Sequence, residues 1–255
     1  MNRQSPLLGI ISVRTLQASL VAMLLHGVFH WPLTGPTAIG LFLTPLLCLY
    51  FVFVFVAPWT WSLPIATRLP TTEKTIALTF DDGPSPETTP FILDILRERG
   101  ATATFFVLGE RAERAPKLIA RIVAEGHALG LHGYSHQPLV LCSRRKFQAE
   151  LNHAAHSLPA QSFPFRPPHG FKNLPMAYWA KQMGMTLCAW SLNPRDYKTD
   201  DPERIAQTLL SQLHPGAIVL LHDGPANAAT VKALPLILDG LAVQGYQTTS
   251  LREPL

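Results

Sequence analysis

Two adjacent carboxylates, Asp81 and Asp82, are the first residues in this sequence whose types and spacing suggest catalysis. They occur in the segment TFDDGP, directly after an apolar run. Adjacent carboxylates repel each other unless a cation lies nearby, so a metal ion bound by one of them would leave the other free to act as a base. The alternative, with about equal weight, is turn formation, because Asp, Gly and Pro all favour turns.

A pair of histidines would complete such a metal site. His132 and His136 are four residues apart in HGYSH, and they would share one face if this segment were helical. Two imidazole nitrogens and the Asp82 carboxylate would supply three protein ligands and leave a position for water, which is the pattern of a catalytic divalent site. Without a carboxylate such as Asp82, two ordinary exposed or hydrogen-bonded histidines would be the better interpretation.

Three further segments carry charged side chains of interest. Arg166 in FRPPHG is either a surface arginine at a turn or a permanently charged group that orients a carboxylate. Asp196 in WSLNPRDY is, in isolation, an ordinary loop acid. His222 in AIVLLHDG, which precedes Asp223, ends a strongly apolar run, and it is either a general acid or a buried, hydrogen-bonded histidine.

A regular alternation of β-like and helix-like segments positions these residues. Strands are predicted at residues 75–80, 102–108, 128–132, 163–166, 185–190, 217–222 and 246–251, and helices at 88–99, 116–125, 144–157, 174–183, 202–213 and 227–243. This alternation predicts an α/β fold of parallel βα units, closed into a barrel or open as a doubly wound sheet. The candidate residues follow the predicted strands, and the carboxyl ends of such strands form the active-site face.

Taken in order, five motifs resemble the polysaccharide deacetylase family, also called the NodB-homology domain or carbohydrate esterase family 4. They are TFDDG, HxxxH, RPPxG, a loop from Trp to Asp, and LLHD. The resemblance covers residues 73–255. It implies a distorted (β/α) barrel and one divalent metal, with zinc favoured over cobalt or nickel. It also implies hydrolysis of N-acetyl groups on a glycan that contains amino sugars.

The resemblance implies a role for each matching residue. Asp82, His132 and His136 would be the metal ligands, Asp81 the catalytic base and His222 the general acid.

Four other positions take supporting roles by the same resemblance. Arg166 would hold Asp81, and Asp196 would tune His222. The backbone N–H of His169 would contact the oxyanion, and Leu220 would line the pocket for the acetyl methyl group.

The sequence departs from the family pattern at three positions. Gly133 stands where Ser or Thr is usual, His169 replaces a common Tyr, and Tyr197 stands where Trp often follows Asp196. These changes concern groups around the metal ligands and the surface that contacts the sugar, so the chemistry itself remains expected.

The expected function is therefore metal-dependent hydrolysis of an amide on an amino sugar. The alternatives are a related O-acetyl esterase or N-deformylase, a non-catalytic carbohydrate-binding descendant of the fold, and a membrane protein with a structural appendage. The glycan is left open among peptidoglycan, chitooligosaccharides, exopolysaccharides and lipid-linked intermediates.

The charge distribution separates this region from an apolar leader. Residues 1–70 hold three of the 21 basic residues and none of the 17 acidic ones, so the net charge of +4 indicates no nucleic-acid surface. Residues 38–57 contain no charge and are long enough for a transmembrane helix. Residues 16–30 form a shorter second candidate that either crosses the membrane or lies in its interface.

We therefore expect a membrane-anchoring region over residues 1–58, a linker rich in Pro and Thr over 59–72, and the deacetylase domain over 73–255. A lipid membrane is an expected partner, most simply the bacterial inner membrane. The number of crossings, and hence the membrane face that carries the domain, is left open.

Overall fold

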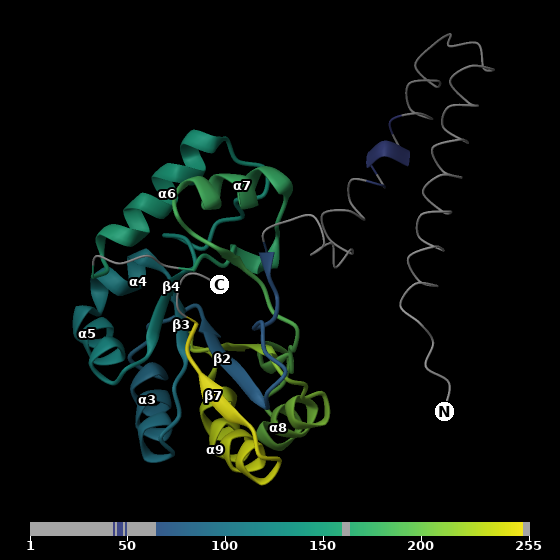
Figure 1. Cartoon of the computed structure of the whole chain (residues 1–255). Helices are drawn as coiled ribbons and strands as arrows, with labels where there is room; N and C mark the ends of the chain where they lie inside the picture. Colours follow the sequence, from purple (N-terminus) through teal and green to yellow (C-terminus); the bar gives the residue numbers. More distant parts are fainter. Residues whose placement is uncertain (1–42, 44, 48, 50–64, 160–163, 252–255) are drawn as a thin grey trace, which may run out of the picture. The chain divides into compact units, whose positions relative to one another are not determined.

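The structure is a computed structural model, and it describes residues 43, 45–47, 49, 65–159 and 164–251 (Figure 1). The chain divides into two compact units, Met1–Ala57 and Pro58–Leu255.

In the first unit, the described residues are helical and have exposed side chains. They lie within the predicted membrane helix 38–57. The remainder of that helix, and all of the predicted segment 16–30, lie outside the described residues. Within the part of the chain that the structure describes, no helix has the length and apolar character needed to cross a bilayer.

A parallel sheet forms the centre of the second unit (Figure 1). Its strands are β2 (Thr75–Asp81), β3 (Thr104–Val107), β4 (Ala128–Leu131), β6 (Ile218–His222) and β7 (Gln247–Thr249). The order is β4-β3-β2-β6, and β7 pairs with the first residues of β2. β2 is therefore the central strand.

Single parallel bridges extend this sheet into a distorted barrel. Leu131 bridges to Phe165, and Phe165 bridges to Leu187. The chain then continues to Leu192, which bridges to Val219 in β6. These bridges connect the two edges of the sheet through single residue pairs, so the ring is closed but irregular. The barrel, and not the open sheet, is the better description of the predicted alternation.

The helices lie outside the strands and follow them in sequence (Figure 1). They are α3 (Thr89–Glu98), α4 (Gly109–Arg114), α5 (Pro116–Ala124), α6 (Arg144–His156), α7 (Leu174–Gln182), α8 (Pro202–Ser211) and α9 (Ala228–Val243). All but α4 match predicted helices. The sequence does not predict α4 because its six residues, GERAER, contain too few apolar side chains to define a helical period.

The central strands are apolar because both of their faces are buried. Leu78 and Phe80 in β2 and Val219 in β6 are fully buried on one face, and Ala77 in β2 and Ile218 in β6 are fully buried on the other. These side chains fix the strands rigidly in the core. Consequently the charged side chains at the strand ends are held by a well-packed framework.

Part of the predicted linker contributes to the sheet. β1 (Ile65–Ala66) lies within residues 59–72 and pairs in parallel with β5 (Leu187–Cys188). The N–H of Leu69 also donates a hydrogen bond to the carbonyl oxygen of Gly216 at 2.8 Å. The segment from Ile65 onward is thus bonded into the α/β unit, and it is not a free connection.

Candidate active site

One cavity of about 340 Å³ collects most of the side chains that the sequence singles out. The register of β2 and β6 places Asp81 beside His222, and His132 directly follows β4. The residues that line the cavity are Asp81, Asp82, His132, His136, His169, Gly170, Trp190, Asn193, Tyr197, Leu220, His222 and Asn227. Seven of the nine predicted site residues are among them. The other two, Arg166 and Asp196, do not line the cavity, but they hydrogen-bond to the lining residues Asp81 and His222, respectively.

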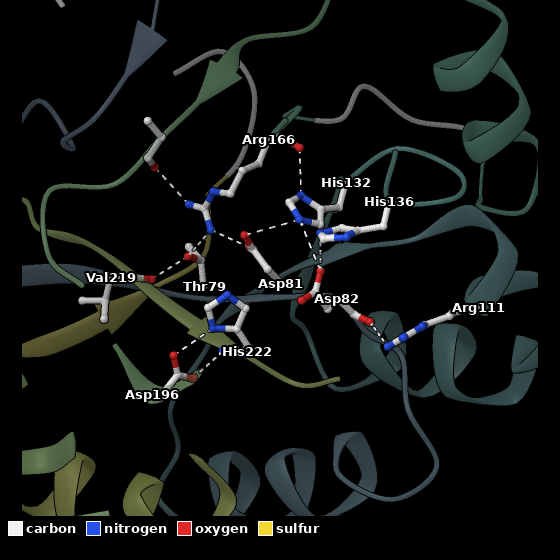
Figure 2. Close-up of polar contacts among 11 residues, drawn as sticks. Thr79, Asp81, Asp82, Arg111, His132, His136, Arg166, Asp196, Val219 and His222 are labelled. Carbon is white, nitrogen blue, oxygen red and sulfur yellow. Dashed lines mark hydrogen bonds and ion pairs between the residues drawn. The ribbon is translucent and has the colours of Figure 1, made fainter. Parts of the chain in front are cut away.

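Asp82, His132 and His136 form a compact group of metal-ligand type. One ligand atom from each lies within 4.8 Å of the other two. The Oδ1 atom of Asp82 is 3.4 Å from His132 Nε2 and 3.1 Å from His136 Nε2. The Nδ1 atom of His132 is 2.9 Å from the carbonyl oxygen of Arg166, which can only accept, so Nδ1 donates and the Nε2 atom faces the group. Asp81 Oδ2 lies 3.8 Å from the same Nε2 atom (Figure 2).

The chemistry of this group fits a divalent cation. Asp82 Oδ1 is buried and accepts no hydrogen bond from the residues that the structure describes. Burial by itself would raise the pKa of the Asp82 carboxyl, but the contacts and charges of His132 and His136 outweigh burial and hold this pKa well below its usual range. An ionised oxygen without a hydrogen-bond donor, facing two imidazole nitrogens, is what a zinc-type ligand set requires.

The segment HGYSH that supplies both histidines is a loop, so the helical arrangement that would place both imidazoles on one face is not the one found. Gly133 has φ of +87° and His136 has φ of +60°, and these values turn the chain where a helix would continue. The Glu150 carboxylate, from α6, holds the loop: its Oε1 accepts from the backbone N–H groups of Tyr134 at 3.1 Å and Ser135 at 3.0 Å. The two imidazoles therefore converge through loop geometry.

Asp81 is held by a buried arginine. The Nη1 atom of Arg166 donates to Asp81 Oδ1 at 2.7 Å and to Thr79 Oγ1 at 2.6 Å (Figure 2). Its Nη2 atom donates to the carbonyl oxygen of Ala189 at 3.0 Å, and the guanidinium lies 4.0 Å from the centre of the Phe106 ring. Arg166 is fully buried. Its rigid fork therefore fixes one oxygen of Asp81 and leaves the other facing the ligand group.

His222 is paired with Asp196 of the short 3-10 helix η2 (Asp196–Lys198). Asp196 Oδ1 accepts from His222 Nδ1 at 2.8 Å, and Oδ2 accepts from the backbone N–H of His222 at 2.8 Å (Figure 2). Burial lowers the pKa of His222, but the hydrogen bond and charge of Asp196, aided by Asp81 and Asp82, outweigh burial and raise it to about 9. The imidazole is therefore protonated at neutral pH.

His169 and Leu220 both line the cavity, as predicted. His169 has φ of +59°, in the turn after Pro168, and its ring lies 4.3 Å from the His136 ring in an edge-to-face arrangement. Leu220 comes from β6, two residues before His222, and is nearly fully buried.

Several residues of the site were not predicted. Arg111 in α4 donates from Nη1 to the carbonyl oxygen of Asp82 at 2.5 Å, which ties the DDGP turn to the next helix. Trp190, Asn193 and Asn227 also line the cavity; the sequence assigns none of them a role, although Trp190 and Asn193 lie in the segment WSLNPRDY. Trp190 is the residue that could have been found from the sequence, because it is an aromatic side chain at the start of the motif segment that contains Asp196. The asparagines and Arg111 resemble many surface residues in sequence.

Asp223 lies next to His222 in sequence but does not line the cavity. Its side chain is fully buried, and its Oδ2 accepts from Thr89 Oγ1 at 2.6 Å. Burial raises the pKa of Asp223 to about 7. The carboxyl packs against Gly83, where a Cβ atom would come within 2.0 Å of Asp223 Oδ2, so this position requires glycine. Asp223 therefore packs against the DDGP turn on the side away from the cavity lining.

The chain is similar to known deacetylases. The family model described as polysaccharide deacetylase matches residues 68–188. A peptidoglycan-N-acetylglucosamine deacetylase of Bacillus cereus is 36% identical over 197 residues, which are 75% of this chain and 92% of the relative. A chitooligosaccharide deacetylase of Bradyrhizobium sp. is 34% identical over 191 residues, covering 68% of this chain and 87% of the relative.

A solved structure gives the same relationship in three dimensions. The crystal structure of a peptidoglycan N-acetylglucosamine deacetylase in complex with 4-naphthalen-1-yl-N-oxidanyl-benzamide superposes with a TM-score of 0.73 at 32% sequence identity. The match covers 76% of this chain and 95% of that structure. Fold and sequence agree, and the chain belongs to the polysaccharide deacetylase family.

Proposed function

We propose that the protein hydrolyses N-acetyl groups on a glycan that contains amino sugars, with one divalent metal, preferably zinc, held by Asp82, His132 and His136. One observation carries the proposal. The three-ligand group shares a cavity with a carboxylate held by a buried arginine, Asp81, and with a protonated histidine, His222. A deacetylase needs these three functions together.

The chemistry of an amide sets the requirements. Its carbonyl is a poor electrophile and its nitrogen a poor leaving group, so water must be activated and the nitrogen must be protonated. A divalent metal, when bound, supplies a Lewis acid that polarises a carbonyl oxygen and makes water more acidic.

Asp81 is the base in this proposal. Arg166 neutralises and orients its Oδ1, so Oδ2 is the oxygen that accepts a proton from the attacking water. The carboxylate is nearly fully buried, which keeps this proton transfer away from bulk solvent. The water oxygen bonds to the carbonyl carbon while its proton passes to Asp81.

His222 is the acid. Its Nδ1 is bound to Asp196, so Nε2 carries the proton that is transferred to the departing nitrogen. When the carbon–nitrogen bond breaks, this proton leaves with the amine and acetate is the second product. A pKa of about 9 keeps the imidazole protonated until that step.

Two more residues would contact the acyl group. We propose that the backbone N–H of His169 donates to the oxygen on which negative charge develops, and that Leu220 contacts the acetyl methyl. Both line the same cavity as the ligand group. A cavity of about 340 Å³ is at the small end of the roughly 300–1,000 Å³ found for ligand sites, which suits an acetamido group and its sugar ring.

The relatives support amino-sugar polymers as substrates, since they are named for peptidoglycan N-acetylglucosamine and for chitooligosaccharides. The test uses the full chain in detergent with added zinc and chitooligosaccharides. We expect acetate and free amine in equal amounts, and loss of both after chelation. Acetate without amine from an O-acetylated glycan, or formate from an N-formyl substrate, would identify the related esterase or deformylase. No product from any of these glycans would support a non-catalytic binding domain.

We also propose that residues 38–57 anchor the protein in the bacterial inner membrane. The support is sequence: twenty consecutive residues without charge, followed by Trp59 and Trp61, which are typical of a lipid interface. A topology reporter fused after Leu255 tests the anchor and the orientation. Recovery of the fusion in the soluble fraction after lysis would contradict it.

A further inference from the structure

The first turn of α9 provides a hydroxyl group to the Asp196–His222 pair. Thr230 is fully buried, and its Oγ1 donates a hydrogen bond to Asp196 Oδ2 at 2.8 Å. It lies three residues after Asn227, the N-cap residue, whose side chain makes no capping hydrogen bond and lines the cavity instead. The start of α9 therefore contributes to both the cavity wall and the support behind it.

The Asp196 carboxylate accepts four hydrogen bonds. Its Oδ1 accepts from His222 Nδ1 at 2.8 Å and from the backbone N–H of Tyr197 at 3.1 Å. Its Oδ2 accepts from the backbone N–H of His222 at 2.8 Å and from Thr230 at 2.8 Å. Of these four donors, Thr230 is the one that belongs to neither η2 nor β6, so it bonds Asp196 to a third element, α9.

We propose that Thr230 is a positioning residue for deacetylation, because its hydroxyl holds Asp196 in the orientation that aims His222 Nε2 at the departing nitrogen. The inference rests on the proposed function, since it concerns the general acid of that reaction. Thr230 is not among the residues that line the cavity, so it acts through Asp196.

The carboxylate of an aspartate has a weak rotational preference of its own. The terminal torsion of Asp is broad, so hydrogen bonds and not rotamer energy decide how the two oxygens face His222. Threonine suits this task because its branched Cβ restricts χ1 within a helix to two main rotamers, and the hydroxyl here bonds Asp196 Oδ2. Valine at position 230 has the same shape but no hydroxyl donor. It would leave the buried Oδ2 atom of Asp196 against a methyl group.

A loosened Asp196 should weaken its bond to His222 and lower the pKa of the imidazole. The titratable groups that face or adjoin His222 are Asp196 and Tyr197 from η2, Asp81 and Asp82 from the end of β2, and Asp223. Among these, Asp196 makes the largest favourable contribution to the charged imidazole. Removing one hydrogen bond to a charged group should therefore move the alkaline limb about one pH unit lower, which reduces kcat about tenfold at pH values above both limbs.

The experiment compares Thr230→Val and Thr230→Ser in the full chain in detergent with added zinc. We expect Thr230→Val to show the loss in kcat and the lower alkaline limb, with KM within about twofold of wild type, because the acetyl pocket is untouched. Thr230→Ser retains the donor and should stay within about threefold in kcat. Thr104→Val is the matched control. Thr104 is also fully buried, and its hydroxyl oxygen accepts a hydrogen bond from the backbone N–H of Leu251 at 2.8 Å. It is the first residue of β3 and does not line the cavity.

A second readout does not need the correct substrate. NMR titration of the isotope-labelled His222 imidazole, assigned with His222→Gln, should show a lower pKa in Thr230→Val and an unchanged pKa in Thr104→Val. If Thr230→Val does not fold, Thr230→Ala serves in the same comparison.

The proposal is overturned if folded Thr230→Val keeps the wild-type alkaline limb and the wild-type imidazole titration, or if Thr230→Ser loses as much activity as Thr230→Val. Absence of deacetylation by the wild-type chain would instead contradict the proposed function. In that case, the NMR titration still decides whether Thr230 controls the Asp196–His222 pair.

Discussion

Replacing Asp196 by asparagine removes a charge with little change in shape, and it should change how activity depends on pH. In the wild type, Asp196 accepts from His222 Nδ1 at 2.8 Å and is the main reason that the pKa of His222 is raised from 6.5 to about 9. Without that charge, burial dominates and the pKa falls to 6.5 or below. The general acid then loses its proton within the working pH range.

The size of the effect follows from the two pKa values. At about pH 8 a group with a pKa of about 9 is roughly 90% protonated, whereas one with a pKa of 6.5 is roughly 3% protonated. We therefore expect kcat of Asp196→Asn to fall at least about 30-fold at about pH 8 and less than about twofold at about pH 5.5.

The assay is the kcat for release of free amine from a chitooligosaccharide between about pH 5 and pH 10. Asp239→Asn is the control, because Asp239 is an exposed acid that pairs with Arg99 away from the cavity. Its profile should match the wild type. An Asp196→Asn profile with the wild-type alkaline limb, or with an equal loss at every pH, would refute the assignment of His222 as an acid tuned by charge.

Three further results are expected. Asp81→Asn should bind zinc as the wild type does yet lose at least about 10²-fold in kcat, measured by metal content and acetate release, because the base is gone while the ligands remain; retained activity would contradict its role. In the metal-free protein, the raised pKa of His222 contributes stability that is fully present below pH 6.5 and is lost as pH rises through about 9. Urea denaturation should show a decrease of roughly 3 kcal/mol over this range, and a flat profile would argue against the pair. Arg166→Met should lower the free energy of unfolding in urea by about 3–5 kcal/mol, because it leaves the buried Asp81 carboxylate without its partner. Arg97→Met, which breaks an exposed ion pair, should lower it by less than about 1 kcal/mol. Equal losses would contradict the statement that the buried Arg166–Asp81 pair holds the site.

The strand ends could be predicted from the sequence because the parallel strands are strongly apolar until they end. Asp81 and His222 each follow such a run, and parallel pairing with matched register brings them side by side although they are 141 positions apart. The same logic predicts His132 after β4. Closure of the barrel could not be predicted from periodicity, because it depends on single bridges such as Leu131–Phe165 that leave no repeating pattern.

The supporting shell of the site was largely invisible in sequence. Thr79 binds Arg166 across 87 positions and Thr230 binds Asp196 across 34, and a threonine that donates or accepts one such hydrogen bond looks like any other. The path of HGYSH was left open in the sequence for a different reason. A four-residue spacing fits a helix, but Gly133 allows a positive φ that turns the chain into a loop and still brings both imidazoles together.

We propose above all that one metal ion, held by Asp82, His132 and His136, is required for deacetylation. The most direct measurement titrates zinc into the metal-free full chain and follows bound zinc and acetate release from a chitooligosaccharide together. We predict that activity rises in proportion to zinc up to one equivalent per chain, and that Asp82→Ala neither binds this zinc nor gains activity. Full acetate release without metal, or the same one equivalent of zinc bound by Asp82→Ala, would contradict the account.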